Sequence, residues 1–112
     1  MANKSYIGRS KDSDVFLDSN IRKGLISRTH ARILKQVSVE GDIIHEIQDS
    51  SLNGTYVNDY RVKDSQLLKS GDKVAFGHLR GAIIEPGEYA PQTETEFLFV
   101  VSIYVFYKHK RL

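Results

Sequence analysis

The chain of 112 residues contains no cysteine. This absence excludes a disulfide framework, thiol catalysis and every zinc site that needs thiolate ligands. A hydrophobic share of 40% with 27% charged residues is ordinary for a globular protein. Disordered and collagen-like classes are therefore excluded as well. The length suits one compact domain with a core of its own.

Long apolar runs are also missing. Residues 1–9 contain no stretch of signal-peptide length. The longest apolar stretch, 97–107, is about half of the roughly 20 residues that a membrane helix needs. We therefore expect an intracellular, soluble protein without a membrane partner. A net charge of +2 is too small to indicate nucleic acid binding, and the basic residues 108–111 are typical of a solvated chain end.

Short apolar runs bounded by turn residues cover most of the chain. Each run is rich in Val, Ile, Phe and Tyr and ends at Gly, Asn, Asp or Ser, a composition typical of β-strands. No stretch keeps the 3.6-residue period of a helix. The predicted strands lie at 6–7, 15–17, 31–37, 43–47, 55–57, 60–62, 73–76 and from residue 97 onward.

Two connections between these runs have the composition of tight turns. Glu-Gly-Asp at 40–42 predicts a hairpin with a glycine-containing loop. Asn-Asp at 58–59 suits a two-residue turn whose residues tolerate positive φ. Many short strands of this kind pack as two sheets. The sequence predicts an all-β fold, a two-sheet antiparallel β-sandwich, as a single domain over 1–112 with its core at about 6–101 and a C-terminal tail at 102–112.

Three segments that would form loops of this sandwich carry polar chemistry. Gly-Arg-Ser at 8–10 and Ile-Ser-Arg-Thr-His at 26–30 supply two arginines and hydroxyl groups, and 50–58 supplies Asn53 on a glycine turn. A guanidinium donates in parallel to two oxygens and suits a phosphate. A carboxamide carries both a donor and an acceptor for an extended peptide backbone. The set fits recognition of a phosphopeptide, although arginines and Asn-Gly turns are also common on sandwich surfaces.

These motifs together resemble the signature of the forkhead-associated (FHA) domain family. The sequences GR at 8–9, SxxH at 27–30 and NGT at 53–55 occur in that family's order, and the resemblance extends over about 6–101. It implies a β-sandwich whose apical loops bind phosphothreonine in partner proteins, without catalysis and without a cofactor or metal. Loops at 61–65 and 77–81 would add selectivity for the partner.

The resemblance also implies roles for single residues. Arg9 would clamp the phosphate with the Ser27 hydroxyl beside it, Arg28 would add a second positive charge, and Asn53 would hold the peptide backbone. His30 would brace the loop by hydrogen bonding. The residues that would support the site without contacting the ligand are Gly8, His30, Gly54, Thr55 and Asn58.

The sequence departs from the family pattern in two places. Leu52 stands where many members carry threonine or serine, so one hydrogen bond to the ligand, worth about 1 kcal/mol, is missing unless the Ser51 hydroxyl replaces it. Only Met1–Ser5 precede the first predicted strand, so an N-terminal strand is expected to be short or absent.

At the other end of the chain, β-prone apolar sequence continues through 102–107, which predicts an extended C-terminal strand. An uncovered apolar edge strand invites pairing. We expect the tail either to fill the vacant edge or to pair with a second chain in a homodimer. The alternative is a fragment or splice form with an irregular terminus.

Rival functions are an enzyme and a phospho-independent scaffold. The histidines at 30, 45, 78 and 109 are scattered, and the sequence has no metal-binding motif, nucleophile elbow or P-loop. Ser27 and His30, three residues apart on a strand, would point to opposite faces. We therefore expect no enzymatic activity. A dimerisation sandwich that uses an exposed edge strand remains the alternative function, and the family resemblance favours the nucleus over the cytoplasm.

Overall fold

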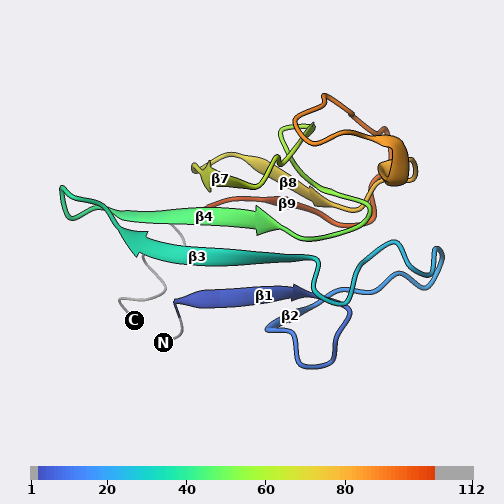
Figure 1. The fold of residues 1–112 in the computed structure, drawn as a ribbon, viewed down its shortest axis with the longest axis horizontal. Coiled ribbons are helices and arrows are strands. Elements are labelled where there is room, and N and C mark those ends of the chain that lie inside the picture. The colour runs from blue at the N-terminus through green and yellow to red at the C-terminus, as the bar shows by residue number, and fades with distance from the viewer. Residues whose placement is uncertain (1–2, 103–112) are drawn as a thin grey trace.

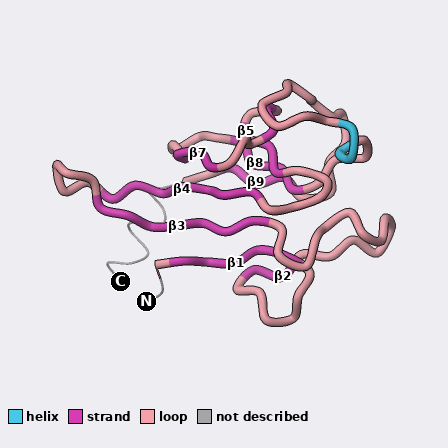
Figure 2. The backbone as a smooth tube through the Cα atoms, viewed as in Figure 1, coloured by secondary structure: helices cyan, strands magenta, loops and turns pink. Residues whose placement is uncertain are grey.

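The computed structural model describes residues 3–102. Its elements are β1 (Lys4–Gly8), β2 (Val15–Phe16), β3 (Ala31–Val37), β4 (Ile43–Asp49), β5 (Thr55–Val57), β6 (Tyr60–Arg61), β7 (Ser65–Leu68), β8 (Lys73–Phe76), the 3₁₀ turn η1 (Gly81–Ile83) and β9 (Leu98–Val100). Figure 2 shows that strands and loops make up nearly the whole of this part of the chain. Within residues 3–102 no helix has the length and hydropathy of a membrane span.

The strands form two sheets, which confirms the predicted β-sandwich. A five-stranded sheet has the order β2-β1-β3-β4-β7, and a four-stranded sheet has the order β6-β5-β8-β9. The pairings are antiparallel with one exception, because β2 runs parallel to β1 with Val15 opposite Ile7. The expectation of purely antiparallel sheets was wrong at this edge, where residues 9–14 loop back before β2 begins.

Both predicted tight turns are present. In the β3–β4 hairpin, Gly41 has a φ of 89°, and Ser38 N donates to Asp42 O at 2.7 Å. In the β5–β6 turn, Asn58 and Asp59 have φ values of 52° and 74°. Positive φ at both central residues defines the turn type whose twist matches a two-residue hairpin. The local sequence therefore determines these two reversals.

Strand β7 was not predicted from the sequence. Ser-Gln-Leu-Leu is poor in β-branched residues, yet β7 pairs with β4 through Gln48–Ser65 and His45–Leu68, and Leu68 is buried. Packing and pairing override a weak strand propensity here. The predicted selectivity loop at 61–65 is shorter than expected, since Arg61 is a buried residue of β6 and Ser65 begins β7, which leaves 62–64 as the connection.

The core lies between the two sheets. Alternate residues of the strands point into it, and three further members lie outside the strands: Leu17 and Ile26 in the long β2–β3 connection, and Val62 just after β6. Ile26 has no exposed surface, so this connection is anchored in the core rather than free. The core cluster comprises Ile7, Leu17, Ile26, Ala31, Ile47, Val57, Val62, Leu68, Val74 and Phe76.

Figure 1 shows the two ends of the sandwich. The β3–β4 hairpin projects at one end, and the β1–β2, β2–β3, β4–β5 and β8–β9 connections gather at the other, which we call the apical end. β1 is the first strand of the described residues and leads directly into Arg9. β9 forms an edge of the four-stranded sheet, while the predicted continuation over 103–112 lies outside the described residues.

Candidate functional site

The first two candidate loops are joined through their backbones. Arg9 N donates to Ser27 O at 3.1 Å, and Ser10 N donates to Arg28 O at 3.2 Å. A Cβ on Gly8 would lie 2.0 Å from Arg28 O, so only glycine allows this close approach. The motif glycine therefore sets the distance between the loop of Arg9 and the loop of Arg28.

Arg9 is exposed and held at one point. Its Nε donates to Ile26 O at 2.8 Å, and Ile26 is anchored in the core. The structure gives the two terminal nitrogens of Arg9 no partner among residues 3–102. A guanidinium oriented by one bond, with its fork open to solvent, can bind two oxygens of an anion. Arg28 is also exposed, and its backbone is bonded to that of Ser10, the residue after Arg9.

His30 links the second loop to the third. It has no exposed surface, and its ring packs edge-on against Phe76 with centroids 5.8 Å apart. Its Nδ1 accepts from Ser27 N at 3.1 Å, and its Nε2 lies 2.7 Å from Gly54 O. This geometry requires the neutral ring with the proton on Nε2. The structure therefore places His30 as a brace, as the sequence analysis expected, and adds Gly54 to its partners.

The protonation state of His30 follows from its surroundings. Burial lowers its pKa below 6.5, and the hydrogen bond to Gly54 and the charge of Asp49 offset this effect only in part. Burial disfavours the charged imidazolium. The neutral ring that the two hydrogen bonds require is thus the form that the environment favours.

The Asn53 loop is built on a carboxylate that the sequence analysis did not single out. Asp49 Oδ1 accepts from Ser51 N at 3.1 Å, Ser51 Oγ at 2.7 Å and Thr55 Oγ1 at 2.9 Å. Ser51 Oγ in turn accepts from Gly54 N at 2.7 Å. The single proton of the Ser51 hydroxyl is donated inside the loop, so Ser51 has no donor left to replace the hydroxyl missing at Leu52.

Gly54 makes the sharp bend after Asn53. Its φ is 94°, and a Cβ there would lie 2.5 Å from the Tyr56 hydroxyl. That hydroxyl donates to Asn53 O at 2.9 Å, and burial raises the pKa of Tyr56 to about 12. The Asn-Gly pair is thus a turn that fixes the position of Asn53.

The Asn53 side chain is half-buried and faces the β2–β3 connection. Its Nδ2 donates to Gly24 O at 3.1 Å and to Leu25 O at 3.2 Å. Ser27 Oγ accepts from Leu52 N at 3.1 Å across the same junction. Both amide protons of Asn53 are therefore engaged within the chain, and its Oδ1 is the atom that faces no partner among residues 3–102. Ser27 and Asn53 meet at one surface, next to Arg9 and Arg28.

Arg61 supports this loop from below. It is buried, its Nη1 donates to Gly81 O at 2.7 Å and to Ile84 O at 2.5 Å, and its Nη2 donates to Leu52 O at 3.1 Å. A Cβ on Gly81 would lie 2.3 Å from Asn53 O. The segment around η1 is therefore pressed against the Asn53 loop, and Arg61 joins the two.

Asn58 lies elsewhere. It is at the opposite end of β5 from Asn53, where its Nδ2 donates to Asp72 Oδ1 and its Oδ1 accepts from Lys73 N, both at 3.0 Å. The expectation that Asn58 supports the Asn53 loop is thus corrected. Asn58 joins the β5–β6 turn to the start of β8, because strand β5 separates it from the Asn53 loop.

Asp49 and Arg61 are the supporting residues that sequence reasoning missed. Asp49 had a local signal, since Asp-x-Ser favours the turn in which a carboxylate accepts from the backbone two residues later. Arg61 had no such signal. Its partners belong to segments at residues 52 and 81–84, which only the folded chain brings together.

A sequence profile of the FHA domain matches residues 6–77, which include every residue of the apical site described above except the segment around η1. The chain belongs to the FHA domain family. Germ layers disorganized gldi-3 of Caenorhabditis elegans is 36% identical over 107 residues, covering 89% of this chain and 11% of that protein. The glycogen accumulation regulator GarA of Mycolicibacterium smegmatis is 42% identical over 73 residues, covering 65% of this chain and 40% of that protein.

Solved FHA structures share the fold. The yeast Dun1 FHA domain, in complex with a doubly phosphorylated peptide derived from Rad53, is 35% identical with a TM-score of 0.55, covering 67% of this chain and 53% of that chain. The MEK1 FHA domain is 27% identical with a TM-score of 0.56, covering 65% of this chain and 61% of that chain. These similarities, together with the two observed sheets, confirm the FHA β-sandwich.

The relatives also bear on the wider expectations. The FHA domain is a binding module, and relatives are named as regulators or as an oxoglutarate dehydrogenase inhibitor of Corynebacterium diphtheriae. Several relatives are bacterial, so they give no support to the predicted nuclear location. The chain spans less than half the length of the curated relatives it matches.

Proposed function

We propose that this chain is a phosphothreonine-binding module without enzymatic activity, whose apical loops recognise phosphorylated threonine in an intracellular partner protein. The observation that carries the proposal is the link made by His30, which joins the backbone of Ser27 to that of Gly54. Because of this link, the loops of Arg9, Arg28 and Asn53 form one fixed surface. The solved Dun1 relative, which is in complex with a phosphorylated peptide, supports the same chemistry.

The proposed roles follow from the free groups. The open guanidinium fork of Arg9 binds two phosphate oxygens, and Arg28 adds positive charge. Ser27 contributes its hydroxyl, and the Oδ1 of Asn53 accepts from a backbone N–H of the peptide. The engaged amide protons of Asn53 limit its donation to the ligand, which refines the earlier expectation that it uses both functions. Gly8, Gly54, Thr55 and His30 hold the surface without contacting the ligand.

The domain that performs this function extends beyond the matched residues. The sequence profile ends at residue 77, but Arg61 and Gly81 join the later segment to the Asn53 loop. β9 then completes the four-stranded sheet. We infer that residues 6–101 form one folding unit, with 102–112 as an addition to it.

Calorimetric titration with matched peptides tests the proposal. The set carries phosphothreonine, phosphoserine or plain threonine in the same flanking sequence. We expect a micromolar dissociation constant for the phosphothreonine peptide only, which corresponds to a binding free energy of about −8 kcal/mol. Equal affinity for the phosphorylated and plain peptides would contradict the proposed function.

The alternative is a scaffold that works through β9 and does not read phosphate. Leu98, Phe99 and Val100 are all exposed on this edge strand, with fractions of 50%, 46% and 63%. An exposed apolar edge can pair with a strand of a second copy. Light scattering, which measures the oligomeric state, distinguishes the two functions when it is combined with the peptide titration. A dimer with no phosphopeptide affinity supports the scaffold, and a monomer that binds phosphothreonine excludes it.

A further inference from the structure

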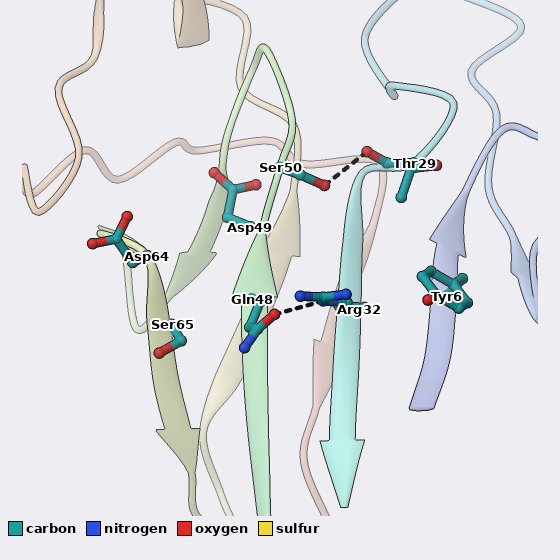
Figure 3. A pocket seen from close by; sticks show the side chains of 8 residues that line it. All are labelled: Tyr6, Thr29, Arg32, Gln48, Asp49, Ser50, Asp64 and Ser65. Carbon is teal, nitrogen blue, oxygen red and sulfur yellow. Dashed lines mark hydrogen bonds between the residues drawn. The ribbon is translucent and has the colours of Figure 1, made fainter. Parts of the chain in front are cut away.

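A hollow of about 410 Å³ lies on the outer face of the five-stranded sheet, below the apical loops (Figure 3). Its floor is a row of side chains from four paired strands, with Tyr6 opposite Arg32, Arg32 opposite Gln48, and Gln48 opposite Ser65. Neighbouring residues such as Ile7 and Ile47 point into the core. We call this hollow the outer-sheet groove; its lining is Tyr6, Thr29, Arg32, Gln48, Asp49, Ser50, Asp64 and Ser65.

The groove is continuous with the proposed phosphate site. Its upper rim is formed by Thr29 and Ser50, which are joined by the bond from Ser50 Oγ to Thr29 O at 3.1 Å. Thr29 follows Arg28 in the chain, and Ser50 precedes Ser51 of the Asn53 loop. An extended peptide advances about 3.3 Å per residue. A peptide held at the apical loops therefore reaches the groove within a few residues.

The groove has an acidic end. Pairing of β4 with β7 places Asp49 beside Asp64, and Asp49 N donates to Asp64 O at 3.2 Å. Figure 3 shows both carboxylates on the same side of the groove, with Arg32 and Gln48 at its centre and Tyr6 at the far side. Two carboxylates against the single guanidinium of Arg32 give the lining a formal charge of −1.

The two carboxylates differ in how freely they can bind a ligand. Asp49 already accepts three hydrogen bonds from Ser51 and Thr55 through Oδ1. Asp64 is exposed, and its side chain has no hydrogen-bond partner among residues 3–102. Arg32 is fixed by the bond from its Nε to Gln48 Oε1, and it repels a cation from the centre of the groove. A basic ligand group is thus favoured at one end only.

We propose that the outer-sheet groove binds the part of the partner that flanks the phosphothreonine and selects a lysine or arginine there, held chiefly by Asp64. This inference rests on the proposed function. The apical surface is cationic and the groove end is anionic. Together they can bind a phosphate and a basic side chain that lie a few residues apart in the peptide. Opposite charges at two fixed positions orient the peptide and disfavour the reversed direction.

A lysine scan tests the groove. Phosphothreonine peptides of one neutral background carry a single lysine, or a single glutamate, at each position within about five residues of the phosphate, a span set by the extended chain. Calorimetry measures each peptide against the wild type, Asp64→Lys and the matched control Asp42→Lys. Asp42 is exposed in the β3–β4 hairpin at the opposite end of the sandwich and undergoes the same charge change.

We expect lysine at one position, or at two adjacent ones, to raise wild-type affinity about threefold, the size of an exposed ion pair. In Asp64→Lys the preference should reverse, so that glutamate at the same position binds more tightly, whereas Asp42→Lys should keep the wild-type order. Equal affinity for all peptides of the scan, or a preference that Asp64→Lys leaves unchanged, would overturn the proposed role of the groove and leave the proposed phosphothreonine binding intact. Failure of every phosphopeptide to bind the wild type would overturn both proposals.

Discussion

The apical end contains two sets of polar residues that differ in burial and in bonding. Arg9 and Arg28 are exposed, and Arg9 is tied to the chain by one side-chain hydrogen bond. His30 and Arg61 are buried, and each joins segments that are distant in sequence. Removing an exposed group costs little unfolding free energy, whereas removing a buried one leaves its hydrogen-bond partners unsatisfied. We therefore expect binding and stability to depend on different residues of the same surface.

The largest effect is expected from Arg9→Ala. Loss of a charge-assisted fork should weaken phosphothreonine-peptide binding roughly a hundredfold or more, with little change in the melting temperature. Arg9→Lys is the matched control, because it keeps the charge and loses the fork. Its affinity should lie between those of the wild type and Arg9→Ala. Calorimetry with thermal unfolding measures both effects. Wild-type affinity in Arg9→Ala would remove Arg9 from the site.

Arg61→Met should act in the opposite way, mainly on stability. The substitution keeps an apolar stem but removes the donor of Leu52 O and Ile84 O and one of the two donors of Gly81 O, which costs about 3 kcal/mol of unfolding free energy. Denaturant unfolding measures the loss. An unchanged unfolding free energy would show that Arg61 does not join the two segments. Arg61→Lys, with its single nitrogen, should recover only part of the loss.

His30 should make stability depend on pH. Its pKa in the folded chain is lowered below 6.5, so the unfolded chain binds more protons in acid. Stability from this residue is complete above about pH 6.5 and falls as the pH drops toward the folded pKa. His30→Gln should lower stability by about 2 kcal/mol at neutral pH through the lost hydrogen bonds, and it should flatten the decline in acid. Urea unfolding between about pH 5 and 8 measures both the loss at neutral pH and the decline in acid. An equally steep decline in the variant would assign the pH dependence to other groups.

The smallest effect, a gain, is expected from Leu52→Thr. Leu52 is 68% exposed, so its replacement should leave the unfolding free energy nearly unchanged. A hydroxyl at this position should add one hydrogen bond to the peptide, about 1 kcal/mol or fivefold in affinity. Leu52→Val, similar in shape without the hydroxyl, is the control. Equal affinities of the two variants would show that position 52 does not face the ligand.

Much of the fold was predictable because its signals are local. The positive φ of Asn58 and Asp59, the glycine at 41 and the apolar runs of β3, β4, β5 and β8 are properties of neighbouring residues. β7 escaped prediction because its pairing with β4, and not its composition, makes it a strand. The parallel placement of β2 likewise depends on where the chain returns to β1.

For the candidate site, the motifs alone predicted which residues would carry the chemistry, because GR, SxxH and NGT are contiguous or nearly so. Tertiary structure alone decided how those groups are held. Asp49, Arg61 and the close contact of Gly81 with Asn53 connect segments whose approach depends on strand order and on the segment between β8 and β9. The same reason removes Asn58 from the site and creates the outer-sheet groove. Short-range patterns specify turns and side-chain types, whereas contacts between distant segments exist only once the sheets have packed.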